Sequence, residues 1–286
     1  MAWLDSNWCE LSWTPWVKFS GQRSDWRKLP GGSGVYRVRP VGQRFLMYVG
    51  QTGRSLRGRL HDLQRNTLAD LMPYDDPHTA APNLWAWRQE ERWDYECSAA
   101  PTTLSEKDRK AVECYLLWQY RLERKESTLC NHGRFHKDYK KSGLRATGFR
   151  GGRLSAHDER NPSGGRSHYP LEATGEPSKE NWMGLKWTEI SPFEGKLDRI
   201  PNGAGLYKLR LLTEPDLLYI GETMSLRVRL TAHQRRYREK REVSFSYVPL
   251  QEGIHEYELR ELENDLLGAY YAFARTAPQD QFGRAK

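Results

Sequence analysis

The sequence has little cysteine and no long apolar segment. Its four cysteines, Cys9, Cys97, Cys114 and Cys130, form no Cys-x-x-Cys pair and no paired Cys/His spacing. Neither a zinc knuckle nor a disulfide framework is therefore indicated. No apolar run approaches the roughly 18 residues of a membrane-spanning helix, and the start MAWLDSNWCEL lacks the basic and apolar blocks of a signal peptide. We therefore expect a cytoplasmic protein with reduced thiols and no membrane partner.

Basic residues exceed acidic ones, and the excess is concentrated in two segments. The formal net charge is +8; residues 134–170 hold nine Lys/Arg against three Asp/Glu, and residues 225–241 hold seven against one. Such clusters fit a polyanion, because each Lys or Arg that meets a phosphate releases counterions. A solvated surface explains either segment alone equally well. The candidate nucleic-acid-binding residues are Arg57, Arg227, Arg235, Arg236, Lys140, Lys141, Arg145, Arg150 and Arg153.

A long stretch of the chain occurs twice. GSGVYRVRPVGQRFLMYVGQTGRSLRGRLHDLQRN at 32–66 is answered by GAGLYKLRLLTEPDLLYIGETMSLRVRLTAHQRR at 203–236. AVECYLLWQY at 111–120 is likewise answered by ELENDLLGAY at 261–270. The best-matched letters are Gly, Tyr, Thr, Ser and Arg rather than an apolar period, which is typical of a duplicated site.

The repeat divides the chain into two predicted domains, 1–140 and 181–286. Residues 141–180 are rich in Gly, Ser, Pro and Arg with no apolar period, so they are interpreted as a basic linker. Gly50 to Glu113 spans 63 residues and Gly221 to Glu263 spans 42, so the first domain carries an insertion of 21 residues, placed near 66–100.

Each repeat has the local order strand, turn, strand, loop, helix. GLYKLRLL alternates apolar and basic residues as a half-buried strand does, and LLYIG returns as a second strand that ends at a glycine. Ser225 is expected to cap a helix whose buried face carries Leu226 and Leu230, and Ser55 repeats this pattern.

Two tripeptides in each repeat suggest a family. They are GVY at 34–36 with YVG at 48–50, and GLY at 205–207 with YIG at 219–221, and the two tyrosines are 12 residues apart in both copies. This arrangement resembles the GIY-YIG nuclease superfamily. The resemblance implies an α/β fold of the α+β type, with two modules that are each a small, mainly antiparallel sheet flanked by helices. It leaves the linker, the insertion and the Trp-rich start unexplained.

The resemblance also implies site residues. Glu113 and Glu263 match the family's metal ligand, a hard oxygen donor suited to Mg²⁺ (or Mn²⁺) with water completing the shell. The other matching residues are the tyrosines of the two tripeptides and an amide near the end of each module: Tyr36, Tyr48 and Asn131, then Tyr207, Tyr219 and Gln281. Gln281 is one methylene longer than the family's asparagine, which puts the second site in doubt. The alternative for the tyrosines is core packing in strands.

The helix arginine is clear in one repeat only. Arg229 and His233 have the family's Arg-x-x-x-His spacing and share a helix face. In the first repeat, the leucine pattern makes Arg59 the counterpart and leaves Leu63 at the histidine position; the competing choice is Arg57 with His61.

Two further features have open interpretations. DDPH at 75–78 has metal-binding residue types, but Asp and Pro are common in turns. Tryptophans within residues 3–26 and at 85, 87 and 93 are compatible with base stacking or with covering the sheets.

These patterns predict an endonuclease with two active sites in one chain, which makes double-strand cuts in DNA for restriction or defence. The alternatives are a structure-selective nuclease for branched or damaged DNA, and a DNA-binding protein in which one copy has decayed. We expect double-stranded DNA as the partner and no small-molecule cofactor. The patterns leave the oligomeric state open and are compatible with a monomer.

Overall fold

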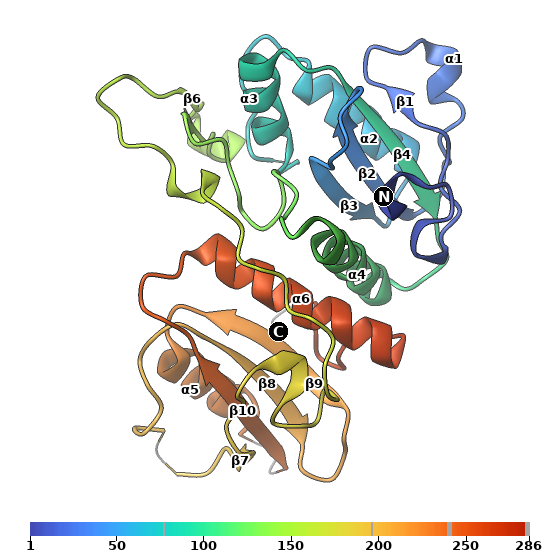
Figure 1. Cartoon of the computed structure of the whole chain (residues 1–286). Coiled ribbons are helices and arrows are strands. Elements are labelled where there is room, and N and C mark those ends of the chain that lie inside the picture. Colours follow the sequence, from blue (N-terminus) through green and yellow to red (C-terminus); the bar gives the residue numbers. More distant parts are fainter. Residues whose placement is uncertain (77, 196, 239–241, 284–286) are drawn as a thin grey trace. The chain divides into compact units, whose positions relative to one another are not determined.

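The computed structural model describes residues 1–76, 78–195, 197–238 and 242–283. These residues form six α-helices, two four-stranded antiparallel sheets and one two-stranded sheet (Figure 1). The predicted α+β class is therefore confirmed. The chain divides into two compact units, the first made of Met1–Arg109 with Ser127–Arg166 and the second of Lys110–Glu126 with Ser167–Lys286. Within the described ranges, no helix has the length and apolar character needed to cross a membrane.

The two large sheets have the same topology. In the first unit the strand order is β1 (Val17–Lys18), β4 (Tyr95–Pro101), β2 (Gly34–Pro40) and β3 (Tyr48–Thr52). In the second unit it is β7 (Ser191–Pro192), β10 (Val243–Pro249), β8 (Gly205–Leu211) and β9 (Leu217–Thr223). Tyr36 pairs with Gly50 as Tyr207 pairs with Gly221. The duplicated sequence therefore folds into a duplicated sheet with a shared register.

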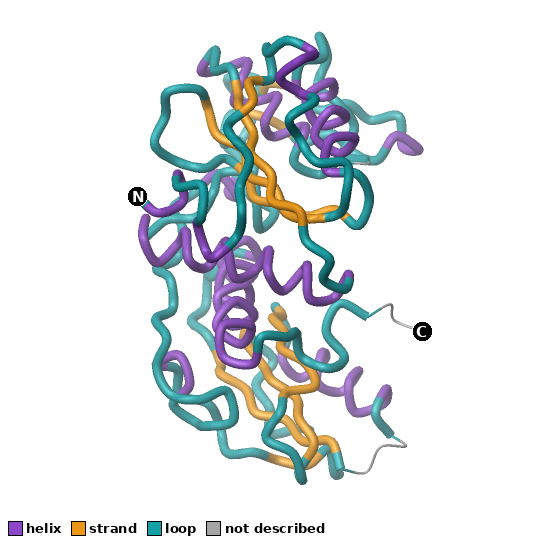
Figure 2. Tube along the Cα trace, turned by 90° about the vertical axis from the view of Figure 1, so that its right-hand side faces the viewer, coloured by secondary structure: helices purple, strands orange, loops and turns teal. Residues whose placement is uncertain are grey.

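Helices cover the sheet faces within each unit (Figure 2). In the first unit, α2 (Leu56–Thr67) and α3 (Ala81–Glu91) share a core with the sheet, and a short α1 (Arg23–Trp26) precedes β2. In the second unit, α5 (Leu226–Arg236) packs on one face of the sheet and α6 (Glu256–Ala274) on the other. The Ser55 hydroxyl caps α2 by accepting from the Gly58 N–H at 3.1 Å. Ser225 is at the cap position of α5 but makes no side-chain cap bond.

The inserted residues occupy a shorter stretch of the chain than the predicted 66–100. Residues 68–94 separate α2 from β4, whereas residues 237–242 separate α5 from β10. The difference of 21 residues matches the predicted length, but residues 95–100 belong to β4, the counterpart of β10, and so are part of the common sheet. The inserted residues build α3, whose Leu84 joins the core of the first unit.

The Trp-rich start is part of the repeat. Trp8 and Trp13 stack with ring centroids 5.8 Å apart, and Trp182 and Trp187 do so at 6.0 Å. A cation from the sheet lies against each pair. Arg37 of β2 lies 4.2 Å from the Trp13 centroid, and Lys208 Nζ of β8 lies 4.5 Å from the Trp187 centroid. These four indoles are buried, so they cover the sheets as cation–π partners and are not presented for base stacking.

Part of the predicted linker folds onto the first unit. β5 (Tyr139–Lys140) pairs with β6 (Gly152–Arg153), and the Arg150 guanidinium lies 4.3 Å from the Tyr74 centroid. The division between the units falls between Arg166 and Ser167. The predicted boundary at 140 therefore differs from the observed one, because cation–π contacts and backbone hydrogen bonds, which leave no apolar period, hold this segment.

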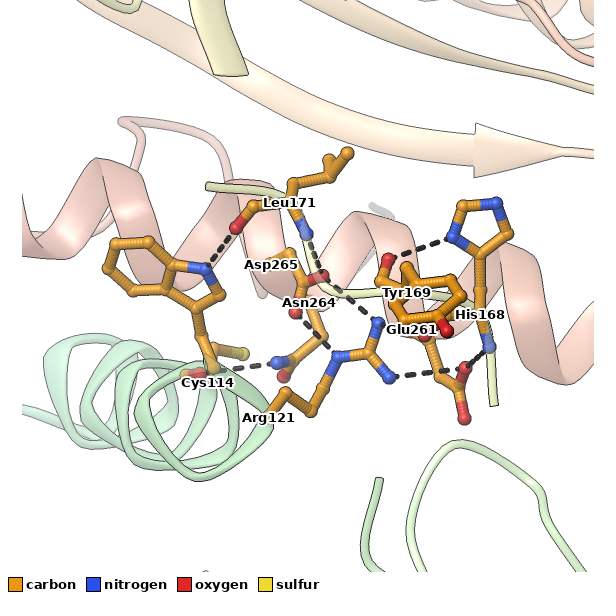
Figure 3. Close-up of polar contacts among 9 residues, drawn as sticks. Cys114, Arg121, His168, Tyr169, Leu171, Glu261, Asn264 and Asp265 are labelled. Carbon is orange, nitrogen blue, oxygen red and sulfur yellow. Dashed lines mark hydrogen bonds and ion pairs between the residues drawn. The ribbon is translucent and has the colours of Figure 1, made fainter. Parts of the chain in front are cut away.

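Helix α4 (Glu106–Arg124) is the other departure, because its residues from Lys110 onward belong to the second unit. There it lies beside α6 (Figures 1 and 2). Arg121 is fully buried and forms ion pairs with Asp265 at 2.8 Å and Glu261 at 3.2 Å (Figure 3). The backbone N–H groups of His168 and Leu171 donate to the same two carboxylates. The network ties α4, α6 and the chain after Arg166 together.

We predict that Arg121→Met strongly destabilises the second unit. The substitution leaves two buried carboxylates without their cation, which typically costs about 3–5 kcal/mol. Denaturant unfolding followed by tryptophan fluorescence measures the loss. Arg260→Met on the exposed face of α6, where Arg260 pairs with Glu256 at the surface, is the control, with an expected change below about 0.5 kcal/mol. Equal effects of the two substitutions would contradict the assigned role.

Candidate active site

In the second unit, three predicted residues meet above the sheet. Tyr207 on β8 and Tyr219 on β9 stack with centroids 6.0 Å apart, and His233 on α5 lies 5.2 Å from both rings. The Tyr207 hydroxyl forms a 3.0 Å hydrogen bond with His233 Nε2. Burial, assisted by the charges of Arg229 and Arg236, lowers the pKa of His233 to about 4. His233 is therefore a neutral partner of the hydroxyl at pH 7.

Arg229 and Glu263 complete this group. Arg229 is exposed on α5, one turn before His233, and its charge acts on both tyrosines and on Glu263. Burial raises the pKa of Glu263, on α6, to about 8; the neighbouring Glu222 acts in the same direction, whereas Arg229 opposes the rise. The second unit thus brings all its predicted catalytic and metal-binding residues into one electrostatically coupled group.

The donor set of this group fits a hard divalent cation. Glu263 is partly buried next to a second acidic residue, Glu222, and its raised pKa favours the neutral carboxyl. A bound cation would favour the carboxylate and compensate the charge of both groups. Over the described ranges, no three His, Cys, Asp or Glu side chains converge as a closed metal cage. A site with one or two carboxylates and several waters is the kind that Mg²⁺ prefers. Sequence reasoning missed Glu222, although it directly follows YIG; the first unit has Gln51 there.

The first unit repeats the tyrosine pair with a different partner. Tyr36 and Tyr48 have ring centroids 6.0 Å apart. Arg59 Nε on α2 donates to the Tyr36 hydroxyl at a long 3.4 Å. Leu63, at the position of His233, is buried in the core.

The competing choice for the first repeat, Arg57 with His61, makes other contacts. Arg57 donates to the backbone carbonyl of Leu29 at 2.8 Å, as Arg227 does to that of Ile200, so both brace the chain before the first repeat strand. His61 is exposed and packs edge-on against Trp26. Arg59 is therefore the arginine that reaches the tyrosine pair.

Glu113 lies on the part of α4 that belongs to the second unit. The first unit by itself therefore contains Tyr36, Tyr48 and Arg59 but not the carboxylate. Both Glu113 and Glu263 act on the thiol of Cys114, whose pKa burial raises well above its usual range. That Glu113 serves the first tyrosine pair stays a prediction.

The terminal amides have equivalent structural contacts. Asn131 Oδ1 accepts from the backbone N–H of Val49, and Gln281 Oε1 accepts from that of Ile220, both at 3.0 Å. Asn131 also donates to the Val49 carbonyl. Each amide thus fixes the residue before the glycine of the second tripeptide, and the longer side chain of Gln281 keeps this bond. The backbone contact is therefore the same in both units, and whether Gln281 weakens the second site stays a prediction.

The predicted nucleic-acid-binding residues are mostly exposed, and some of them form ion pairs within the protein. On the β5–β6 hairpin, Lys140, Arg145, Arg150 and Arg153 are exposed. Arg153 pairs with Glu90 at 3.0 Å, and Lys141 pairs with Asp75 at 2.9 Å. Arg235 and Arg236 are exposed at the end of α5. Residues 239–241, the end of the second basic segment, and Pro77 of DDPH lie outside the described residues.

Comparisons of the chain with protein-family models, with curated proteins and with solved structures found no match. The assignment of function therefore depends on the geometry of the site.

The glycine of the second tripeptide is required by the tyrosine of the first. A Cβ atom added at Gly50 would lie 2.6 Å from Tyr36 Cζ, and one at Gly221 would overlap the Tyr207 ring. We predict that Gly50→Ala and Gly221→Ala each displace the tyrosine and destabilise their unit by roughly 1–3 kcal/mol. Thermal unfolding measures this loss. Gly152→Ala, where the added atom meets nothing within 4 Å, is the control; equal stability of all three variants would contradict the packing argument.

The buried imidazole makes the second unit sensitive to acid. Because the folded-state pKa of His233 is about 4, below the usual value near 6.5, its contribution is fully present above pH 6.5 and is lost as the pH falls towards 4. The expected loss is roughly 2 kcal/mol by pH 5. We predict that His233→Gln flattens this pH dependence, measured as the difference in unfolding free energy between pH 7.5 and 5. His157→Gln, on the exposed surface, should leave it unchanged; a wild-type slope in His233→Gln would contradict the assignment.

Proposed function

We propose that the chain is a metal-dependent DNA endonuclease of the GIY-YIG type, with one site in each repeat. The observation that carries the proposal is the hydrogen bond between Tyr207 and neutral His233 beside Tyr219, Arg229 and Glu263. A tyrosine pair with Arg59 repeats part of this arrangement in the first unit. Core packing alone accounts for tyrosines in strands, but it does not account for a cation and a desolvated carboxylate coupled to them.

Each residue of the second site has a role in phosphodiester hydrolysis. Burial raises the pKa of Tyr207 far above its usual range, so its hydroxyl is neutral and acts as a relay. It can take a proton from an attacking water while it passes its own to His233 Nε2. The exposed guanidinium of Arg229 balances the charge that develops on the phosphate. When bound at Glu263 with Glu222 nearby, Mg²⁺ would supply further charge stabilisation as a Lewis acid.

The first site differs in the group beside its tyrosine. There the Tyr36 hydroxyl has a cation, Arg59, as its neighbour, where the Tyr207 hydroxyl has a neutral imidazole. A guanidinium can stabilise negative charge that develops on the phosphate, but it does not accept a proton at pH 7. The two repeats therefore differ in the group that contacts the tyrosine hydroxyl.

The charge of the chain supports DNA as the substrate. The net charge of +8 is accompanied by exposed basic side chains on the β5–β6 hairpin and at the end of α5. Contacts of such side chains with phosphates are independent of sequence and weaken with salt. Two sites in one chain suit cleavage of both strands of a duplex, as restriction or defence requires.

One observation favours a second candidate function, a DNA-binding protein with one decayed copy. The first unit lacks a helix histidine, and Leu63 is buried in its place. In this alternative the first repeat reads DNA and only the second repeat cuts it.

We predict that the wild-type protein cleaves plasmid DNA only with Mg²⁺ or Mn²⁺, and that the double variant Glu113→Gln/Glu263→Gln loses cleavage roughly a thousandfold or more. Loss of the metal ligand removes several kcal/mol of charge stabilisation, whereas DNA affinity, measured by gel shift, should change little. Glu256→Gln, at an exposed carboxylate on α6, is the control. Full cleavage by the double variant, or no cleavage by the wild type on any duplex, would contradict the proposal.

A further inference from the structure

The first unit contains a pocket beside its tyrosine pair that the repeat does not explain. It has a volume of about 720 Å³ and lies between β3, the start of α2, the start of α4 and the insertion. The ionisable side chains that line it are Arg54, Arg59, Arg109, Asp62, Glu106 and His78. Three arginines against two carboxylates make it a cationic pocket. Arg109 is held there by bonds from Nε to Gln51 Oε1 and from Nη1 to the Leu104 carbonyl.

His78 lines this pocket and has a buried ring nitrogen that lacks a hydrogen-bond partner among the described residues. Only 2% of its surface is exposed, and its Nε2 is buried with no hydrogen-bond partner among the described residues. A buried nitrogen of this kind costs free energy unless it gains a partner. Burial, followed by the charge of Arg59, lowers the pKa of His78 to about 4, while Asp62 opposes this. The ring is therefore neutral at pH 7, with one nitrogen that donates and one that accepts.

The insertion brings His78 to the helix that lacks a histidine. His78 lies between α2 and α3, and the charges of Arg59, Asp62 and Arg65, all on α2, act on its ring. In the second unit the corresponding helix carries its own histidine, His233, and no comparable insertion follows it. The unit with Leu63 at the helix position is thus the unit that has a histidine supplied from elsewhere in the chain.

We propose that His78, which the insertion supplies to the unit without a helix histidine, binds a phosphate group of the DNA in this pocket together with Arg59. The proposal rests on the proposed function for its substrate. A phosphate oxygen would give Nε2 the partner that the described residues do not provide, and Arg59 would supply the charge. Asp62, which also lines the pocket, pairs at the surface with Arg65 at 3.0 Å, and this pair offsets part of its charge.

The direct test uses the histidine ring nitrogens of the full-length protein as NMR probes. We expect inorganic phosphate to shift the ¹⁵N signals of His78 in a saturable way, and Arg59→Met to weaken that binding at least tenfold. His136, a buried histidine near the insertion that packs on Trp87, should not respond. Unshifted His78 signals at saturating phosphate and with a short duplex would overturn the inference, and this result requires no variant of His78 to fold.

A cleavage assay distinguishes a phosphate-binding role of His78 from a purely structural one. In a Glu263→Gln background, in which only the first site is intact, His78→Gln should lower kcat at least tenfold with a smaller change in KM. His136→Gln should lower thermal stability without this kinetic effect. Unchanged cleavage in His78→Gln would overturn the inference and leave the proposed function standing. A chain that cuts no DNA but shows the phosphate-dependent shift would overturn the function and leave a phosphate site.

Discussion

The buried ion pairs of Arg121 hold together the two helices that carry the candidate metal ligands. Glu113 is on α4 and Glu263 on α6, and these helices pack closely where Gly268 meets the backbone of Cys114. Asp265 and Glu261 give the guanidinium its counter-charges and also accept backbone N–H groups of the chain after Arg166. Removing one member of such a buried network strongly destabilises the fold, and the intact network favours one arrangement of its elements. The spacing of the two carboxylates therefore depends on a contact outside both tyrosine pairs.

Within each repeat, the tyrosine pair depends on a glycine and an amide. The glycine leaves room for the tyrosine ring, and Asn131 or Gln281 fixes the strand next to that glycine. What surrounds the tyrosine hydroxyl then differs, with a neutral histidine in the second unit and an arginine in the first. The two repeats therefore share the packing around the tyrosine pair more closely than they share the groups that would move protons.

Much of the fold and of the candidate sites could be predicted from the sequence, because local sequence patterns determine these features. Alternating residues, the repeated glycines and the leucine phase of α2 were enough to place the two strands that carry each tyrosine pair, and Arg59. The strands β1, β4, β7 and β10 were not predicted. The assignment of α4 to the second unit could not be predicted, since it depends on Arg121 meeting Asp265 across 144 residues. The hairpin 139–153 was missed because cation–π contacts and backbone hydrogen bonds hold it and leave no apolar period. The placement of His78 was missed because it lies in the insertion, which has no counterpart in the second repeat. Whether Glu113 serves the first tyrosine pair stays a prediction.

The central claim is that both repeats cut DNA, each on its own strand. The most direct measurement is single-turnover cleavage of a duplex whose two strands carry different end labels, with the single variants Glu113→Gln and Glu263→Gln compared with the wild type. The account predicts that the wild type cuts both strands and that each variant cuts one strand only, the two variants cutting opposite strands. One variant that cuts both strands like the wild type, with the other inactive on both, would contradict it.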